Sequence, residues 1–282
     1  MPDAEPDAAA SPSAAVPAAG SRPAAGPVAL TPGPARGRVL GEVAIVLALS
    51  LGASAVYAVV SLVAKLTAPG SLGSATARLN SSVSPRPYLD LTYQLLGIAF
   101  ALAPVVLVVW LLAAPPAGLR GSLSRLGLSL PVRARDLAWG AVLAAAIGLP
   151  GLGLYAVGRA LHVTARVVPD GLQSVWWAVP VLVLAAVKNA VLEEVIVAAY
   201  LMRRLEDAGW GPRSRTAASA LLRGSYHLYQ GFGPFVGNAV MGVVFAEWFR
   251  RTGRTWPLIV AHTLLDVVAF VGYRLVAGPN GW

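Results

Sequence analysis

The chain has 282 residues, of which 56% are hydrophobic and 12% are charged. Soluble domains carry about 25% charged residues, so this composition excludes an ordinary soluble domain and indicates a polytopic membrane protein. The absence of cysteine excludes a disulfide framework, a thiolate metal site and a cysteine nucleophile. The formal net charge is +9. Most arginines fall between apolar segments, so we assign this charge to topology and anionic lipid headgroups rather than to nucleic acid.

The N-terminal region, residues 1–38, is rich in Ala, Pro, Ser and Gly and shows no apolar periodicity. We expect it to form a disordered cytoplasmic tail, because such a composition cannot bury a core. Acidic residues Asp3, Glu5 and Asp7 stand where a signal peptide would carry positive charge, and no apolar run follows them. We therefore do not expect a signal peptide here.

The remainder of the chain contains apolar runs of membrane-spanning length. A span needs about 20 mostly apolar residues. On this rule we predict an all-α polytopic transmembrane bundle of about seven helices, near 40–64, 91–114, 137–160, 175–202, 214–229, 233–250 and 256–276. The fifth helix is interrupted by Arg215 and Arg223, and the sixth is short.

The distribution of arginine predicts the orientation. The links after the second, fourth and sixth predicted helices are richer in arginine than those after the first and third, and the link after the fifth has no charge. The positive-inside rule then places the N-terminus in the cytoplasm and the C-terminus outside. We expect an integral protein of a bacterial plasma membrane.

Two adjacent acids, Glu193 and Glu194, lie inside the long apolar run 191–201. An ionisable residue in the membrane is costly and is by default a functional-site hypothesis. In an α-helix the two side chains diverge by about 100°, so one can contact a reacting water while the other takes a structural partner. Other polar residues of the later predicted helices are Arg223, His227, Asn238, His262 and Asp266.

These polar residues are expected to meet. At about 1.5 Å per residue, the depths of Glu193, His227 and His262 overlap near the middle of a core about 30 Å thick. His262 and Asp266 have i, i+4 spacing and share one helix face, as do Arg223 and His227. The spacing therefore predicts one polar cluster inside the bundle.

Such a cluster fits hydrolysis. A desolvated glutamate can act as a general base, and a histidine can share its water or donate to a developing oxyanion. Glu193, His227 and His262 would also suit a divalent ion such as Zn²⁺. These residues are compatible with a metal-bound water and with a glutamate-activated one. No other cofactor is expected.

Two more polar residues have ordinary explanations. Lys188 is expected to pair with a carboxylate or to reach the membrane surface. Asn238 is expected mainly to join helices by hydrogen bonding, with a supporting place in the site as the alternative. A proton-coupled transporter using the glutamate pair is disfavoured, since the chain shows no internal repeats.

The order of these residues resembles the CPBP family, which contains the CAAX prenyl endopeptidases and bacterial relatives linked to bacteriocin processing and immunity. The resemblance covers about 175–270 and rests on Glu-Glu, on a histidine before Tyr-Gln-Gly, and on His-x-x-x-Asp. It implies an intramembrane endopeptidase, of metallo- or glutamic type, acting on a membrane-embedded or lipidated peptide. In the family pattern, Glu193 and His227 would activate water, and His262 and Asp266 would orient substrate or stabilise the oxyanion.

The sequence departs from the family pattern at two positions. Ala198 replaces the motif arginine that follows the glutamates, and Arg223 replaces the phenylalanine before His227. A buried unpaired charge is costly, so we expect Arg223 to replace the lost cation and to pair with Glu194. The alternative is a non-catalytic relative that acts as a membrane immunity, scaffold or partner-binding protein.

This interpretation divides the chain into three parts. Residues 1–38 form the tail, 39–172 form accessory transmembrane helices, and 173–276 form the catalytic transmembrane core. The expected partners are the lipid bilayer and a membrane-associated peptide, and no nucleic acid.

Overall fold

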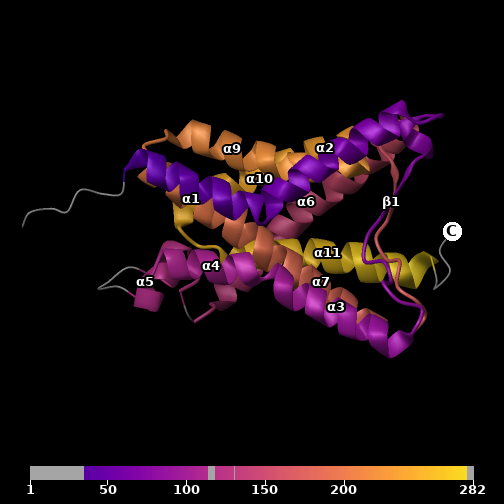
Figure 1. Cartoon of the computed structure of the whole chain (residues 1–282), viewed down its shortest axis with the longest axis horizontal. Coiled ribbons are helices and arrows are strands. Elements are labelled where there is room, and N and C mark those ends of the chain that lie inside the picture. Colours follow the sequence, from indigo (N-terminus) through magenta and orange to yellow (C-terminus); the bar gives the residue numbers. More distant parts are fainter. Residues whose placement is uncertain (1–34, 114–117, 130, 278–282) are drawn as a thin grey trace, which may run out of the picture. The chain divides into compact units, whose positions relative to one another are not determined.

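The computed structural model describes residues 35–113, 118–129 and 131–277. The predicted tail therefore lies outside the described residues, except for its last four. The described chain is mostly helical, with one two-stranded sheet, which confirms the all-α prediction (Figure 1). Its α-helices, in chain order, are α1 (Arg36–Ala48), α2 (Leu51–Thr67), α3 (Pro87–Ala101), α4 (Ala103–Leu111), α5 (Gly118–Arg125), α6 (Ala134–Ala160), α7 (Ala178–Glu193), α8 (Leu201–Asp207), α9 (Pro212–Ser225), α10 (Phe232–Thr252) and α11 (Trp256–Ala277).

Shorter elements join these helices. A π-helix, η2 (Glu194–Tyr200), connects α7 to α8, and a 3₁₀ turn, η3 (Leu228–Gln230), connects α9 to α10. Another 3₁₀ turn, η1 (Leu72–Ser74), precedes strand β1 (Thr76–Arg78). β1 pairs in parallel with β2 (Arg166–Val168), so the links after α2 and after α6 meet in a small sheet that the sequence did not predict.

The number of spans differs from the seven that we expected. By length and composition, four helices of the described chain could cross a membrane: 87–111, which joins α3 and α4, then α6, α10 and α11. The pair α1 and α2 counts as a fifth if it is one span, although it bends by 56°. Helix α9 has only 14 residues and α7 only 16 before η2 begins, and both are shorter than the roughly 20 that a span needs. The predicted orientation of the termini stays a prediction.

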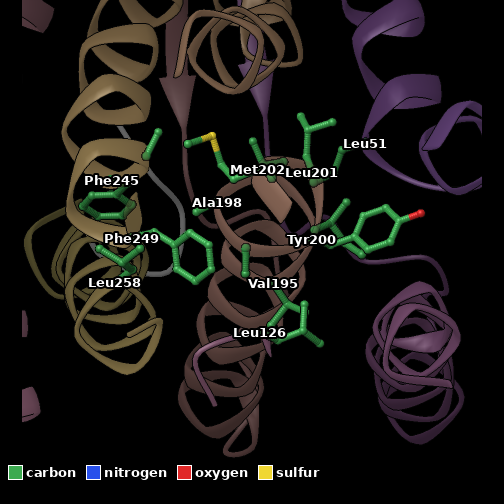
Figure 2. Packing of buried hydrophobic residues seen from close by; sticks show 14 of the residues in the cluster. Leu51, Leu126, Val195, Ala198, Tyr200, Leu201, Met202, Phe245, Phe249 and Leu258 are labelled. Atoms are coloured by element: carbon green, nitrogen blue, oxygen red, sulfur yellow. The ribbon is translucent and has the colours of Figure 1, made fainter. Parts of the chain in front are cut away.

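The segment from α7 to α8 is the centre of the packing. Every residue from Glu194 to Met202 is at most 3% exposed. Figure 2 shows side chains of α10 and α11, Phe245, Phe249 and Leu258, together on one side of this segment, and Leu51 of α2 on the other. The most completely buried stretch is therefore the one that carries the glutamate pair. The exposed apolar side chains of the other helices can face lipid in a bilayer.

Close helix contacts bring α9 and α11 to this central segment. α9 packs along α10, and α11 packs against both α6 and α7 (Figure 1). At Gly242 of α10, an added Cβ would lie 2.8 Å from the Ala220 Cα and 3.3 Å from the Arg223 Cβ of α9. Small residues permit such close backbone approach between membrane helices. This close approach of α9 to α10 places the Arg223 side chain in the interior of the bundle.

Candidate active site

The glutamate pair lies at the junction of α7 and the π-helix η2. A π-helix bonds i to i+5, and such turns are frequent at functional sites. Glu193 and Glu194 both reach Arg223 of α9 and His262 of α11. The sequence predicted that both could face the interior with different partners.

Both carboxylate oxygens of Glu194 are occupied. Oε1 lies 2.6 Å from Nδ1 of His262, and Oε2 accepts a hydrogen bond of 2.7 Å from Nη2 of Arg223. The residue is fully buried. Glu194 is therefore a fixed anion that joins α7, α9 and α11, with no oxygen left for a substrate.

Glu193 is held through one oxygen. Its Oε2 accepts a 2.7 Å hydrogen bond from the hydroxyl of Tyr226 and lies 3.4 Å from Nη1 of Arg223. Nε2 of His262 lies 4.0 Å from the same oxygen. Within residues 35–113, 118–129 and 131–277, no hydrogen bond reaches Oε1 of Glu193. This free oxygen, on a side chain that is 11% exposed, can accept a proton from water.

Arg223 supplies the cation of the site. Its side chain is completely buried, pairs with both glutamates, and lies 5.3 Å from the centroid of the Phe245 ring. The pairing of Arg223 with Glu194 confirms our prediction from the sequence. Ala198, where the family pattern has arginine, is buried in the apolar core. Arg223 of α9 thus supplies to the glutamate pair the cation that Ala198 cannot supply.

A second chain of contacts reaches His262 from the other side. Nε2 of His262 lies 3.7 Å from Oδ1 of Asp266, as the i, i+4 spacing predicted. Oδ2 of Asp266 accepts a 2.9 Å hydrogen bond from the Asn189 amide, whose oxygen accepts from the Lys188 ammonium. We did not predict a site role for Asn189. Its position four residues before Glu193, on the same helix face, was the available signal.

His227 lies in the turn between α9 and η3. Its Nε2 is buried and has no hydrogen-bond partner among the described residues. Its Nδ1 lies 3.5 Å from the Gln230 amide nitrogen, and its ring lies 4.9 Å from the Tyr226 ring. A buried polar atom without a partner is costly, so this nitrogen is a candidate to hold water or a substrate group.

Tyr226 is another site residue that we did not predict from the sequence. It lies next to His227 in the chain and is buried, and its hydroxyl bonds directly to Glu193. Asn238, expected as a supporting residue, donates its amide hydrogen to the Pro234 carbonyl of its own helix. Among the described residues, Asn238 therefore makes no side-chain hydrogen bond to the cluster.

The donor set fits a resident metal ion poorly. In the described chain, the acidic and histidine atoms that lie within 4.8 Å of one another belong to Glu193, Glu194 and His262, and not to the expected set with His227. The guanidinium of Arg223 already contacts both carboxylates. A divalent cation would face that fixed positive charge and compete for the same oxygens.

The comparison with protein families gives one match. Residues 175–268 match the family described as type II CAAX prenyl endopeptidase Rce1-like. The match includes both glutamates, both histidines of the cluster and Asp266, and it leaves α1 to α6 outside. No curated protein and no solved structure matches the chain. The match confirms the resemblance inferred from the motifs.

Proposed function

We propose that residues 175–268, which match the type II CAAX prenyl endopeptidase Rce1-like family, carry out a metal-free peptide hydrolysis in which Glu193 is the general base. The single observation that carries the proposal is the asymmetry of the glutamate pair. Glu194 has both oxygens occupied, whereas Glu193 keeps Oε1 free, and Nε2 of His262 lies 4.0 Å from its other oxygen. The enzyme would be a glutamic rather than a metallo-endopeptidase.

In this mechanism Oε1 of Glu193 takes a proton from water, and the water oxygen attacks the peptide carbonyl carbon. The unpaired Nε2 of His227 holds the water. Tyr226 and Arg223 fix Oε2, so the free oxygen has one orientation. General-base catalysis of this kind contributes about 10²- to 10⁴-fold.

The second half of the reaction uses the residues around His262. Nδ1 of His262 is held by Glu194, so that Nε2 lies between Glu193 and Asp266. There the imidazolium form of His262, protonated on both ring nitrogens, donates from Nε2 to the oxyanion of the tetrahedral intermediate. When the carbon–nitrogen bond breaks, the leaving amine takes the proton that Glu193 received. The substrate is a membrane-associated or lipidated peptide.

The test is a cleavage assay in lipid nanodiscs. The probe is an internally quenched peptide ending in a CAAX sequence, with the cysteine farnesylated or left free. Wild-type protein should cleave it, and Glu193→Ala and His227→Ala should each lower kcat/KM by at least about 10²-fold. Asn238→Ala is the matched control, because its amide bonds within its own helix. A folded wild-type protein that cleaves neither peptide would support a non-catalytic relative instead.

A further inference from the structure

An open hollow lies beside the site, between α2 and the turn that follows α9. Its volume is about 380 Å³, and it is lined by Ser54, Tyr57, Ala58, Ser61, Tyr226 and Tyr229. Five of these six residues carry a hydroxyl group. α2 packs directly against η3, so the hollow has one wall on an accessory helix and one wall on the turn that carries His227.

The α2 wall is a polar stripe on an apolar helix. Ser54, Tyr57 and Ser61 are spaced by three and four residues, and Lys65 follows four residues later, so all four lie along one face. Other faces of α2 expose apolar side chains such as Val56 and Val60. We refer to Ser54, Tyr57, Ser61 and Lys65 as the α2 stripe.

The serine hydroxyls of the α2 stripe have no hydrogen-bond partner within the described chain. Elsewhere in these helices, hydroxyls donate to the carbonyl four residues earlier, as Ser50 does to Val46 at 2.6 Å and Thr67 to Val63 at 2.9 Å. Ser54 and Ser61 make no such bond, nor any other side-chain hydrogen bond within the described chain. Their hydroxyls are available to a ligand.

Tyr226 connects the hollow to the reacting group. Its ring lines the hollow, and its hydroxyl bonds to Glu193 at 2.7 Å. At the far end of the stripe, the Lys65 ammonium donates to the Tyr229 carbonyl and lies 5.8 Å from the Tyr229 ring centroid. The hollow therefore runs beside the site, with Lys65 at one end of its wall.

We propose that the α2 stripe binds the extended backbone of the peptide substrate next to its scissile bond. At membrane depth, peptide N–H and C=O groups need partners, because lipid supplies none. The hydroxyls of Ser54, Tyr57 and Ser61, which make no side-chain hydrogen bond within the described chain, supply them. The proposal rests on the proposed function. It adds a binding element on α2, which lies outside the family match at 175–268.

Cross-linking tests the binding independently of cleavage. A photoreactive residue is placed at position 54 or 61 in full-length Glu193→Gln protein, and at position 60 as the control on another face. The farnesylated CAAX peptide should cross-link from 54 and 61 and at least about fivefold less from 60. Wild-type protein that cleaves the peptide while neither 54 nor 61 cross-links would overturn the stripe and leave the proposed function standing.

Kinetics give the second measurement. Ser54→Ala with Ser61→Ala should raise KM about tenfold and leave kcat within about twofold, because uniform binding is lost. Ser50→Ala, whose hydroxyl is occupied by its own helix, should leave both constants unchanged. An unchanged KM in the double variant would contradict the stripe. Cross-linking without any wild-type cleavage would instead overturn the proposed function alone, and a protein showing neither would overturn both.

Discussion

The polar cluster has a closed half and an open half. The closed half, Glu194 with Arg223 and Nδ1 of His262, is buried, and both of its carboxylate oxygens are bonded. The open half, Glu193 with His227, keeps one carboxylate oxygen and one ring nitrogen without partners and borders the hollow through Tyr226. Glu193 and Glu194 are adjacent in sequence but have different roles. Polar groups that have hydrogen-bond partners fix the packing, and polar groups without a partner remain available for chemistry.

The largest effect is expected from removing the cation of the closed half. Arg223→Phe, which restores the family residue, leaves two buried carboxylates without their common partner. Breaking a buried pair costs about 3–5 kcal/mol, so the free energy of unfolding should fall by that amount and activity should be lost. Chemical denaturation in lipid or detergent measures the change.

A second substitution separates a specific ion pair from a general loss of packing. Adding Ala198→Arg to Arg223→Phe returns the cation to the position of the family motif and should recover part of the stability and activity. Arg223→Met with no second change serves as the comparison of similar length. Full stability and full activity in Arg223→Phe alone would show that the pair is dispensable.

The next effect contrasts the two glutamates directly. Glu194→Gln should lower the free energy of unfolding by about 1.5–3 kcal/mol, because hydrogen bonds to charged groups contribute that much. Glu193→Gln should abolish cleavage and have the smaller effect on stability, since only one of its oxygens is bonded. Thermal denaturation and the peptide assay on both variants measure the contrast. The reverse order of stabilities would refute the division into halves.

A smaller effect is expected at Asn189. Asn189→Ala removes the hydrogen-bond donor to Asp266 and should lower kcat/KM about tenfold, with KM little changed, because Asp266 is no longer held beside His262. Asn189→Gln, which can keep the amide, should recover part of the loss. Equal KM and kcat in Asn189→Ala and the wild type would assign the contact to packing alone.

The smallest effect is expected from a chelator. With Arg223 occupying the charge position beside both glutamates, cleavage after incubation with EDTA or phenanthroline should stay within about twofold of the untreated rate. The rate should stay the same because general-base catalysis by a glutamate needs no metal ion. Activity lost on chelation and restored by Zn²⁺ would show that a metal takes part despite the guanidinium.

Helix periodicity and motif order predicted the main features of the last helices. The cluster residues, the i, i+4 relation of His262 and Asp266 and the pairing of Arg223 with Glu194 all follow from spacing and from the cost of buried charge. By length and composition the described helices give four spans, or five with the bent pair α1 and α2, and not seven, because α9 has 14 residues and the predicted span 175–202 is divided into α7, η2 and α8.

By itself, the sequence determined that this is an all-α membrane protein and predicted that Glu193, Glu194, His227, His262 and Asp266 form one cluster in which Arg223 pairs with Glu194. Only the tertiary structure decided which polar atoms of the cluster are left without a partner. That difference arises from the contacts of Glu194 with Arg223 and His262 and of Glu193 with Tyr226. Those contacts join residues far apart in the chain, and no local periodicity encodes which polar atom is left without a partner.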